Sequence, residues 1–224
     1  MPLVEVRHLS KRFGSLAALD GVSFDIRAGE VLGLLGPNGA GKSTLFDCLA
    51  GIQPRDAGTI TPTELFYLPD AIAPWPAQPL GWALDFALDF YGGRRADKPG
   101  LIEQLGLQSF LRQPIGALSK GQRKRGLLAL ALLTPQPLLL IDEPLDGLDL
   151  RQMREVAAVL RAHAARGRTL FLSIHQIGDA ARFCDRFVLL SEGRVRGEGT
   201  VEELAARAGR RADESLEEVF LALT

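Results

Sequence analysis

The sequence predicts an α/β fold in which a mainly parallel sheet is flanked by helices, with a small antiparallel β edge and an inserted helical lobe. Strands that are covered on both faces of a parallel sheet are apolar almost throughout. Four segments have this character: VLGLL (31–35), LLLID (138–142), TLFLSI (169–174) and FVLLS (187–191). Helical patterns lie between them, and this alternation is typical of α/β proteins.

The antiparallel edge is predicted by residues 3–7 and 22–27, where apolar side chains alternate with polar ones. The expected helices of the parallel part follow from apolar periodicity and from a glycine stop after the last of them, and they cover 42–50, 120–134 and 150–166. Each of these helices connects two of the apolar strands or follows one. The order therefore supports the parallel sheet.

Two short helices are expected to close the chain. Thr200-x-x-Glu203 and Ser215-x-x-Glu218 both match the capping-box pattern, in which the first side chain and the fourth satisfy each other's backbone N–H groups. The second match opens SLEEVFLALT, which reads as a terminal helix.

The helical lobe is expected where three prolines precede the stretch GWALDFALDFYGG. Trp82, Phe86 and Phe90 are spaced at i, i+4 and i+8, which puts them on one face of a helix. This aromatic stripe is either the core of the lobe or a docking surface for another protein. We expect a single domain over 1–224, with a core lobe at about 1–70 and 118–224 and a helical lobe at about 71–117.

Composition excludes several classes of protein. The 26 Lys and Arg residues nearly balance 27 Asp and Glu residues, so no strong field attracts the chain to nucleic acid, and no such partner is expected. Cys48 and Cys184 lie in apolar surroundings, which indicates buried, reduced thiols. The longest apolar run, 127–133, is far shorter than the roughly 20 residues that cross a bilayer. A role at the membrane would therefore require a partner.

The segment GPNGAGKS (36–43) fits the P-loop pattern and lies between a predicted strand and a predicted helix, the context in which the pattern binds phosphate. Backbone N–H groups of such a loop point into one concavity at a helix N-terminus. Lys42 is expected to reach the β- and γ-phosphates, and the Ser43 hydroxyl to ligate Mg²⁺. The candidate binding residues are Gly36, Pro37, Asn38, Gly39, Ala40, Gly41, Lys42, Ser43 and Thr44.

Two consecutive carboxylates, Asp142 and Glu143, lie at the end of the apolar strand in LLLIDEP (138–144) and could catalyse hydrolysis. Neighbouring side chains at a strand end point in different directions, so Asp142 can hold Mg²⁺ while Glu143 acts on the attacking water as general base. Alone, the pair could merely end a strand and cap a turn. Beside an intact P-loop, the catalytic interpretation is favoured. His175 follows the strand TLFLSI, at the sheet edge where ligands of open α/β folds collect, and is a candidate γ-phosphate contact.

The segment ALSKGQRKRGLLALALL (117–133) looks like a second helix start suited to an anion. Ser119-x-x-Gln122 is itself a capping-box match, which explains both residues without a ligand. It does not explain Gly121, since glycine in a helix costs roughly 1 kcal/mol relative to alanine. A glycine there would let another group approach the backbone closely.

Together these motifs resemble the nucleotide-binding subunits of ATP-binding-cassette (ABC) transporters over essentially the whole chain. LSKGQ lies about twenty residues before LLLIDEP, with the P-loop upstream and His175 downstream. The flanking segments GLLGPNGAGKSTL, LSKGQRKR, EPLDGLD and SLEEVFLALT resemble the bacterial export type of subunit. The resemblance implies ATP and Mg²⁺ as ligands, ATP hydrolysis, and a separate transmembrane permease as partner.

The resemblance also assigns roles to individual residues. Phe13 matches the aromatic residue that stacks on adenine. Ser119, Gly121 and Gln122 match the signature element, which contacts ATP held by the P-loop of the other protomer. Asp149 in LDGLD matches the residue that links the two sites across that interface. Two ATP molecules would then lie in a head-to-tail homodimer or pseudo-symmetric heterodimer, on the cytoplasmic face of the inner membrane.

Two departures from the family pattern stand out. The family usually has glutamine at the start of the helical lobe, near the Mg²⁺ and the water, whereas YLPD (67–70) places Asp70 there. An aspartate could bind the metal through water, and we expect Asp70 to keep the coupling role toward the permease. The stretch between Gly51 and Leu65 is shorter than usual, which predicts a trimmed edge sheet.

Two alternatives to a transport ATPase compete with this interpretation. A non-transport relative acting on DNA or ribosomes would be expected to carry coiled-coil arms, zinc cysteines or a second cassette, and the sequence has none of these patterns. An inactive regulator is disfavoured because the whole hydrolytic set is present: Lys42, Ser43, Asp142, Glu143 and His175. The sequence does not identify the transported substance, because the substrate contacts would lie in the membrane partner, and export is inferred from the flanking motifs.

Overall fold

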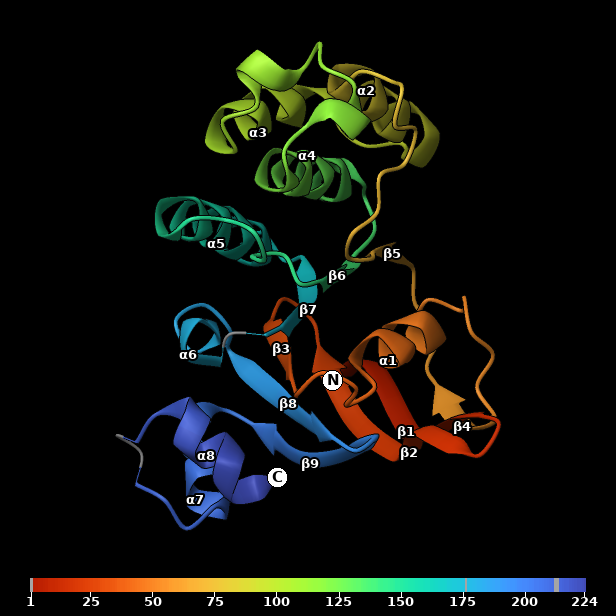
Figure 1. Cartoon of the computed structure of the whole chain (residues 1–224), viewed down its shortest axis with the longest axis vertical. Coiled ribbons are helices and arrows are strands. Elements are labelled where there is room, and N and C mark those ends of the chain that lie inside the picture. Colours follow the sequence, from red (N-terminus) through yellow and green to blue (C-terminus); the bar gives the residue numbers. More distant parts are fainter. Residues whose placement is uncertain (1, 176, 212–213) are drawn as a thin grey trace.

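The computed structural model describes residues 2–175, 177–211 and 214–224, and a six-stranded sheet forms its centre (Figure 1). The strand order is β5-β6-β7-β3-β8-β9, with all neighbours parallel except the antiparallel pair β8 and β9. This confirms the mainly parallel sheet. The strands are β3 (Val31–Leu35), β5 (Leu65–Leu68), β6 (Leu138–Asp142), β7 (Thr169–Ile174), β8 (Arg186–Ser191) and β9 (Arg194–Gly199).

A second, antiparallel sheet has the order β2-β1-β4, and the predicted antiparallel edge is confirmed. Its strands β1 (Pro2–Phe13) and β2 (Leu16–Arg27) are longer than the sequence indicated, and β4 (Ala57–Ile60) pairs with β1 through Val6 and Ile60. The short stretch after Gly51 therefore still contributes one strand to this edge. A four-residue strand with the sequence AGTI gives too little alternation to be recognised from sequence.

The apolar core lies on both faces of the parallel sheet. On β6, Leu138 and Leu140 pack with residues of the antiparallel sheet and of α1 (Lys42–Leu49), whereas Leu139 and Ile141 pack in the other cluster, among the remaining helices. Successive strand residues point to opposite faces. Both faces of β6 are therefore buried, which is why the sequence of this strand is uniformly apolar.

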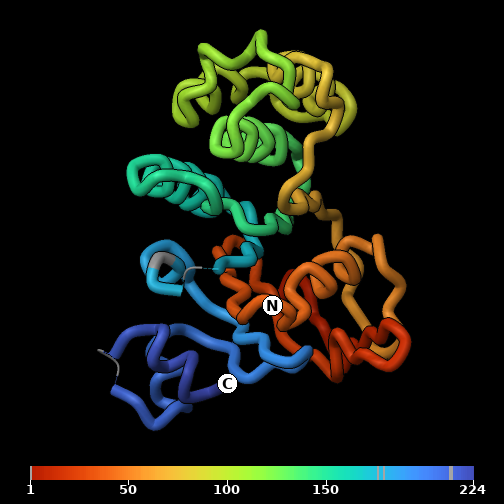
Figure 2. Tube along the Cα trace, viewed as in Figure 1, coloured from red at the N-terminus to blue at the C-terminus, as the bar shows by residue number. Residues whose placement is uncertain are grey.

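The helices are gathered into groups that Figure 1 and the tube in Figure 2 both show. The helices of residues 80–133 lie at one end of the molecule. The two C-terminal helices, at 201–207 and 216–223, lie at the opposite end. The remaining helices are α2 (Leu80–Tyr91), α3 (Lys98–Gln104), α4 (Lys120–Leu133), α5 (Leu150–Ala164), α6 (Ile177–Ala180), α7 (Val201–Arg207) and α8 (Leu216–Leu223). Three short 3₁₀ turns, Arg95–Asp97, Gln108–Phe110 and Ile115–Ala117, connect the lobe. Helix α4 packs against α2, α3 and β5. The limits of the helical lobe at about 71–117 stay a prediction.

The aromatic stripe of α2 faces outward. The side of α2 that packs into the lobe is aliphatic, while Trp82 is 41% exposed and Phe90 is 68% exposed. Trp75 joins the stripe, with its ring centroid 5.0 Å from that of Phe86, and Trp82 and Phe86 stack at 5.3 Å. The alternative in which the stripe forms the core of the lobe is therefore wrong.

The predicted helix caps are confirmed, and the predicted burial is confirmed for Cys48 but not fully for Cys184. Thr200 and Ser215 each form a capping box at the start of α7 and α8. Cys48 and Cys184 are free thiols, buried and half-buried respectively. Within the three described ranges, no helix is both long and apolar enough to span a bilayer.

His163, near the end of α5, makes stability depend on pH. Burial, followed by the nearby Arg168 and Arg166, lowers the pKa of this imidazole from 6.5 to about 4. Between these values the unfolded chain binds a proton that the folded chain does not, so the free energy of unfolding should fall as the pH drops from 7 toward 4. His163→Gln should show a smaller loss between pH 7 and pH 5 in urea unfolding. His8→Asn, which changes an exposed ring, is the control and should keep the loss; equal losses in both variants would contradict the assignment.

Candidate nucleotide-binding site

The P-loop connects β3 to α1, in the context that the sequence predicted. Gly39 and Gly41 have φ values of 81° and 104°, a backbone region that glycine adopts readily. A Cβ on Gly41 would lie 2.5 Å from the Ala18 carbonyl oxygen, and one on Gly36 would lie 2.3 Å from that of Leu190. The loop is therefore held closely between β2 and β8, with α1 beginning at its end.

Lys42 is folded back onto its own loop. Its ammonium group donates hydrogen bonds to the carbonyl oxygens of Gly36 at 2.7 Å and Pro37 at 3.1 Å. Burial lowers the pKa of Lys42, while Glu143 and Asp142 act in the opposite direction and favour its charged form. A buried cation held by two neutral carbonyls is poised to bind phosphate oxygens, which are anionic and stronger acceptors.

Asp142 connects the P-loop helix to two strands. Its carboxylate is 6% exposed, and it accepts a hydrogen bond at 3.0 Å from the Ser43 hydroxyl and a second one from the Ser173 hydroxyl. Asp142 and Ser173 are direct neighbours in the register of β6 and β7. The carboxylate and hydroxyl oxygens of Asp142 and Ser43 form a hard-oxygen donor set, which suits Mg²⁺.

Ser173 is a site residue that the sequence analysis missed. Its hydroxyl also accepts a hydrogen bond at 3.0 Å from the Glu143 backbone N–H, so it contacts both carboxylate residues. The available signal was a fully buried hydroxyl near the carboxyl end of an otherwise apolar strand, two residues before His175. A buried hydroxyl requires a hydrogen-bond partner, and here Asp142 on the adjacent strand β6 supplies it.

Glu143 has surroundings different from those of Asp142. Its φ of 51° is in the left-handed region, which costs a non-glycine residue roughly 1–2 kcal/mol. Burial raises the pKa of Glu143, and the negative charges of Asp142 and Asp70 raise it further. A carboxylate with a raised pKa and a held backbone is suited to accept a proton from water.

A cavity of about 420 Å³ lies beside these groups, and Glu143, His175, Asn38 and Ser173 contribute to its wall. His175 is exposed and lies on the carboxyl edge of the sheet, at the end of β7. The structure thus brings His175 together with Glu143 and with the P-loop residue Asn38.

Phe13 lies at the end of β1, and its ring is 47% exposed. The Lys11 ammonium is 5.3 Å from the centroid of this ring and is itself buried, with an ion pair to Asp56 at 3.4 Å. A cation close to the ring is a favourable contact for its π system. The ring thus has a fixed neighbour and an exposed surface on which another aromatic ring could stack.

Ser119 and Gln122 form the predicted capping box at the start of α4. The Gln122 N–H donates to the Ser119 hydroxyl at 3.3 Å, and the Ser119 N–H donates to the Gln122 side chain at 2.9 Å. A Cβ on Gly121 would lie 3.1 Å from the Gly147 carbonyl oxygen. The absence of a side chain at Gly121 thus lets the loop after β6 of the same chain approach the first turn of α4 closely.

Asp149 forms a second capping box, which the sequence analysis missed. Its carboxylate accepts from the Gln152 N–H at 2.8 Å and begins α5, and the Gln152 side chain accepts from the Asp149 N–H at 3.4 Å. In the described part of the chain, neither Asp149 nor the signature residues Ser119 and Gln122 hydrogen-bond to a P-loop residue. No hydrogen bond among the described residues therefore joins the signature residues or Asp149 to the loop that holds Lys42.

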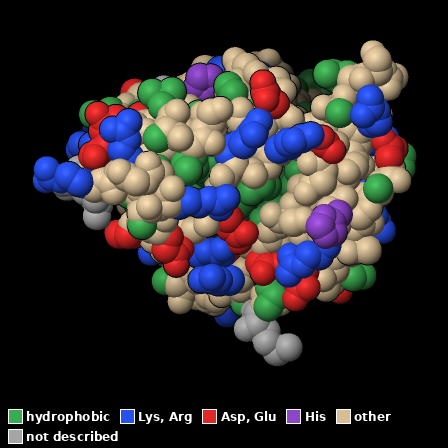
Figure 3. All heavy atoms as spheres, turned by 90° about the horizontal axis from the view of Figure 1, so that it is seen from below, with side chains coloured by type: hydrophobic (Ala, Val, Ile, Leu, Met, Phe, Trp, Pro, Cys, Tyr) green, Lys and Arg blue, Asp and Glu red, His purple; other side chains and the backbone are tan. Residues whose placement is uncertain are grey.

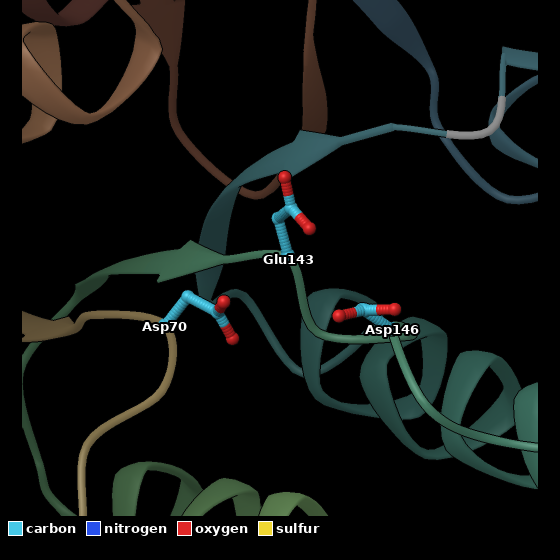
Figure 4. A group of neighbouring side chains, drawn as sticks. All are labelled: Asp70, Glu143 and Asp146. Carbon is cyan, nitrogen blue, oxygen red and sulfur yellow. The ribbon is translucent and has the colours of Figure 1, made fainter. Parts of the chain in front are cut away.

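Asp70 follows β5 and lines a small pocket together with Asp142. One carboxylate oxygen from each of Asp70, Glu143 and Asp146 lies within 4.8 Å of the others, and Figure 4 shows the three residues as neighbours on separate segments. The Asp70 carboxylate forms an ion pair with Lys124 of α4. Sequence patterns gave no indication of this lysine, because nothing in the spacing of 70 and 124 reveals that they meet.

A P-loop whose serine is hydrogen-bonded to a carboxylate at the end of another strand of the same parallel sheet is typical of a nucleotide-hydrolysing α/β protein. Comparison with known proteins agrees. The model of the ABC transporter family matches residues 19–146. The hemin import ATP-binding protein HmuV of Bradyrhizobium diazoefficiens is 33% identical, over 92% of this chain and 85% of that protein. The cytochrome c biogenesis ATP-binding export protein CcmA of Paracoccus denitrificans is 38% identical, over 78% of this chain and 83% of that protein.

A solved structure, described as the ATP-binding subunit of an ABC transporter, is 30% identical and superposes with a TM-score of 0.91 over 99% of both chains. The chain belongs to the ABC transporter family. It is one of the ATP-binding subunits, which are ATPases that form dimers and work with a transmembrane permease.

Ser173 should matter for catalysis more than for binding. In Ser173→Ala, Asp142 loses one of its two side-chain donors and the Glu143 N–H loses its acceptor, so the free energy of unfolding should fall by about 1–3 kcal/mol. Glu143 should lose its fixed orientation, and the ATPase rate should fall by at least roughly tenfold at saturating ATP. ATP affinity, measured by equilibrium binding, should change little because Lys42 and the loop are untouched. Ser191→Ala, a buried serine on β8, is the matched control; equal rates in both variants would contradict the role.

Proposed function

We propose that this chain hydrolyses ATP at the carboxyl edge of its parallel sheet and that the hydrolysis drives export through a separately encoded permease. The hydrogen-bond chain from Ser43 through Asp142 to Ser173 and the Glu143 backbone supports the catalytic part. It fixes the phosphate loop and the general base relative to each other. Lys42 binds the β- and γ-phosphates, Glu143 takes a proton from the attacking water, and His175 contacts the γ-phosphate.

A Mg²⁺ ion would fit the oxygen donors at the start of α1 and at the end of β6. Ser43 and Asp142 would hold it, and Asp70 would contribute through water, since these are the hard oxygen donors that Mg²⁺ prefers. When bound, the ion would neutralise charge on the phosphates. The surrounding residues of the loop would hold the phosphates through their backbone: Gly36, Pro37, Asn38, Gly39, Ala40, Gly41 and Thr44.

The signature residues act on the other protomer. Ser119, Gly121 and Gln122 begin a helix of 14 residues whose N-terminal dipole favours an anion, and they make no hydrogen bond to the P-loop within the described chain. In a two-fold dimer they would contact the γ-phosphate held by the partner subunit, and Asp149 would link the two sites. Phe13 would stack on adenine. The assembly is a homodimer or a pseudo-symmetric heterodimer.

The aromatic stripe is the proposed contact with the permease. Trp82 is 41% exposed and Phe90 is 68% exposed, and both lie on one face of α2. Exposing such an apolar patch to water is unfavourable, and it would be covered if another protein bound there. A permease bound at this stripe would hold the chain at the cytoplasmic face of the inner membrane. Export is favoured by the motifs flanking the P-loop and by the likeness to CcmA, while HmuV is named as an importer.

Nucleic acid is not the proposed partner. On the face drawn in Figure 3, basic and acidic side chains are interspersed, without an extended basic patch. This agrees with the balanced composition of 26 basic and 27 acidic residues. A protein that binds a phosphate backbone requires a clustered positive surface.

The dimer mechanism can be tested with Glu143→Gln. Loss of the general base should lower the ATPase rate by about 10²–10⁴ and trap the ATP-bound dimer, measured by analytical ultracentrifugation in ATP. Ser119→Arg should keep ATP binding to the monomer and lose both dimerisation and hydrolysis, because the bulky cation would occupy the position of the trans contact. Lys42→Ala is the control that should lose ATP binding itself. A Glu143→Gln protein that binds ATP and remains monomeric would rule out the sandwich.

The docking role of the stripe can be tested by exchanging its most exposed rings. Trp82→Ser combined with Phe90→Ser should leave the ATPase activity of the purified subunit unchanged, because neither ring lies near the P-loop. Co-purification of a membrane protein from detergent-solubilised host membranes, identified by mass spectrometry, should be lost. Leu221→Ser, which removes a 74% exposed apolar side chain from α8, is the matched control and should retain the partner. If the double variant still co-purified the membrane protein, the docking site would have to lie elsewhere on the subunit.

A further inference from the structure

Two lysines, one turn apart on α4, bind carboxylates of the core. Lys124 pairs with Asp70, which follows β5, and Lys120 pairs with Asp146, which follows β6, at 2.5 Å. Asp70 and Asp146 thus lie beyond the carboxyl ends of two adjacent parallel strands. The start of α4, which carries the signature residues, is therefore joined to the ATP site of its own chain at two points.

The pair formed by Lys124 and Asp70 is unlike an ordinary surface ion pair. Lys124 is 8% exposed and Asp70 is 31% exposed. Burying a lysine this far is unfavourable unless its charge is compensated, so the position of Lys124 depends on Asp70. Most surface pairs contribute little, because both side chains remain in water.

Asp70 in turn lies beside Glu143. The two carboxylates and that of Asp146 are within 4.8 Å of one another, so each would repel the others without nearby cations (Figure 4). The two lysines of α4 supply those cations. Any change of charge or position near Glu143 therefore acts directly on the groups that hold α4.

Packing reinforces the second contact. A Cβ on Gly147 would lie 2.8 Å from the Lys120 side chain, and one on Gly121 would lie 3.1 Å from the Gly147 carbonyl oxygen. The loop after β6 and the first turn of α4 are in van der Waals contact along this line. A shift of the loop that carries Asp146 would therefore move the first turn of α4.

We propose that Lys124, with Lys120 as a second contact, is a positioning residue that couples the ATP site of one protomer to its signature helix. The inference rests on the proposed function, since the signature helix serves the ATP held by the partner subunit. It goes beyond that function by assigning the coupling to an ion pair within the chain. ATP bound at one P-loop would orient, through Asp70 and Lys124, the helix that completes the other site.

A double-mutant cycle on ATP-dependent dimerisation tests the pair. Lys124→Met, Asp70→Asn and the combined variant are made in the Glu143→Gln background, and the dimer dissociation constant in MgATP is measured by analytical ultracentrifugation. Each single change should weaken the dimer by roughly tenfold, and the combination should be no weaker than either single variant, because both remove the same interaction. Lys98→Met is the matched control: it breaks an ion pair to Asp85 within the helical lobe, at 2.6 Å, and should leave the dimer unchanged.

Hydrogen exchange separates this inference from the dimer mechanism. At protein concentrations where the chain is monomeric, ATP should slow amide exchange over 120–126 in the Glu143→Gln parent and in Lys98→Met. The same slowing should be absent in Lys124→Met. A parent that fails to dimerise would overturn the sandwich, but the exchange readout would still report on the coupling.

Three results would overturn the inference. One is an unchanged dissociation constant in both single variants. Another is a combined variant whose weakening is the product of the two single effects, which would show that the residues act independently. The third is ATP-induced slowing in Lys124→Met equal to that in the control, with circular dichroism showing that both are folded.

Discussion

The buried carboxylate of Asp142 is the group on which the rest of the site depends. At 6% exposure a charge requires donors, and two hydroxyls provide them, one from the P-loop helix and one from the adjacent strand. The register of β6 and β7 places Ser173 opposite Asp142, and the parallel arrangement brings the ends of β3, β6 and β7 to one edge. Because Ser173 also holds the Glu143 backbone, a single hydrogen-bonded unit positions both the phosphate loop and the general base.

The sequence predicted this edge because its physical causes are local. Strands buried on both faces are uniformly apolar, and parallel strands necessarily bring their carboxyl ends together, so Lys42, Glu143 and His175 could be placed near one another without coordinates. The same reasoning missed β5 and β9. LFYL is too short for a pattern, and β9, RVRGEG, is polar because it lies at the edge of the sheet.

The contacts that could not be predicted depend on which of many possible partners a side chain meets. Lys124 is one of several cations in LSKGQRKR, and only the fold shows that it, rather than its neighbours, is buried beside Asp70. Asp149 could be assigned to the dimer interface from its motif, yet its carboxylate caps α5. The helix starts at Ser119 and Asp149 therefore have an internal role in addition to the proposed external one, and substitutions at either will combine effects on folding with effects on assembly.

The left-handed backbone at Glu143 has a consequence for protein engineering. Glycine adopts this conformation with little strain, so a library screened only for thermal resistance should enrich Glu143→Gly. Such a screen would select more robust proteins that have lost the proposed general base. Thermostable versions of this subunit would therefore need a selection in which turnover is assayed alongside heat survival, or a design protocol that keeps position 143 fixed.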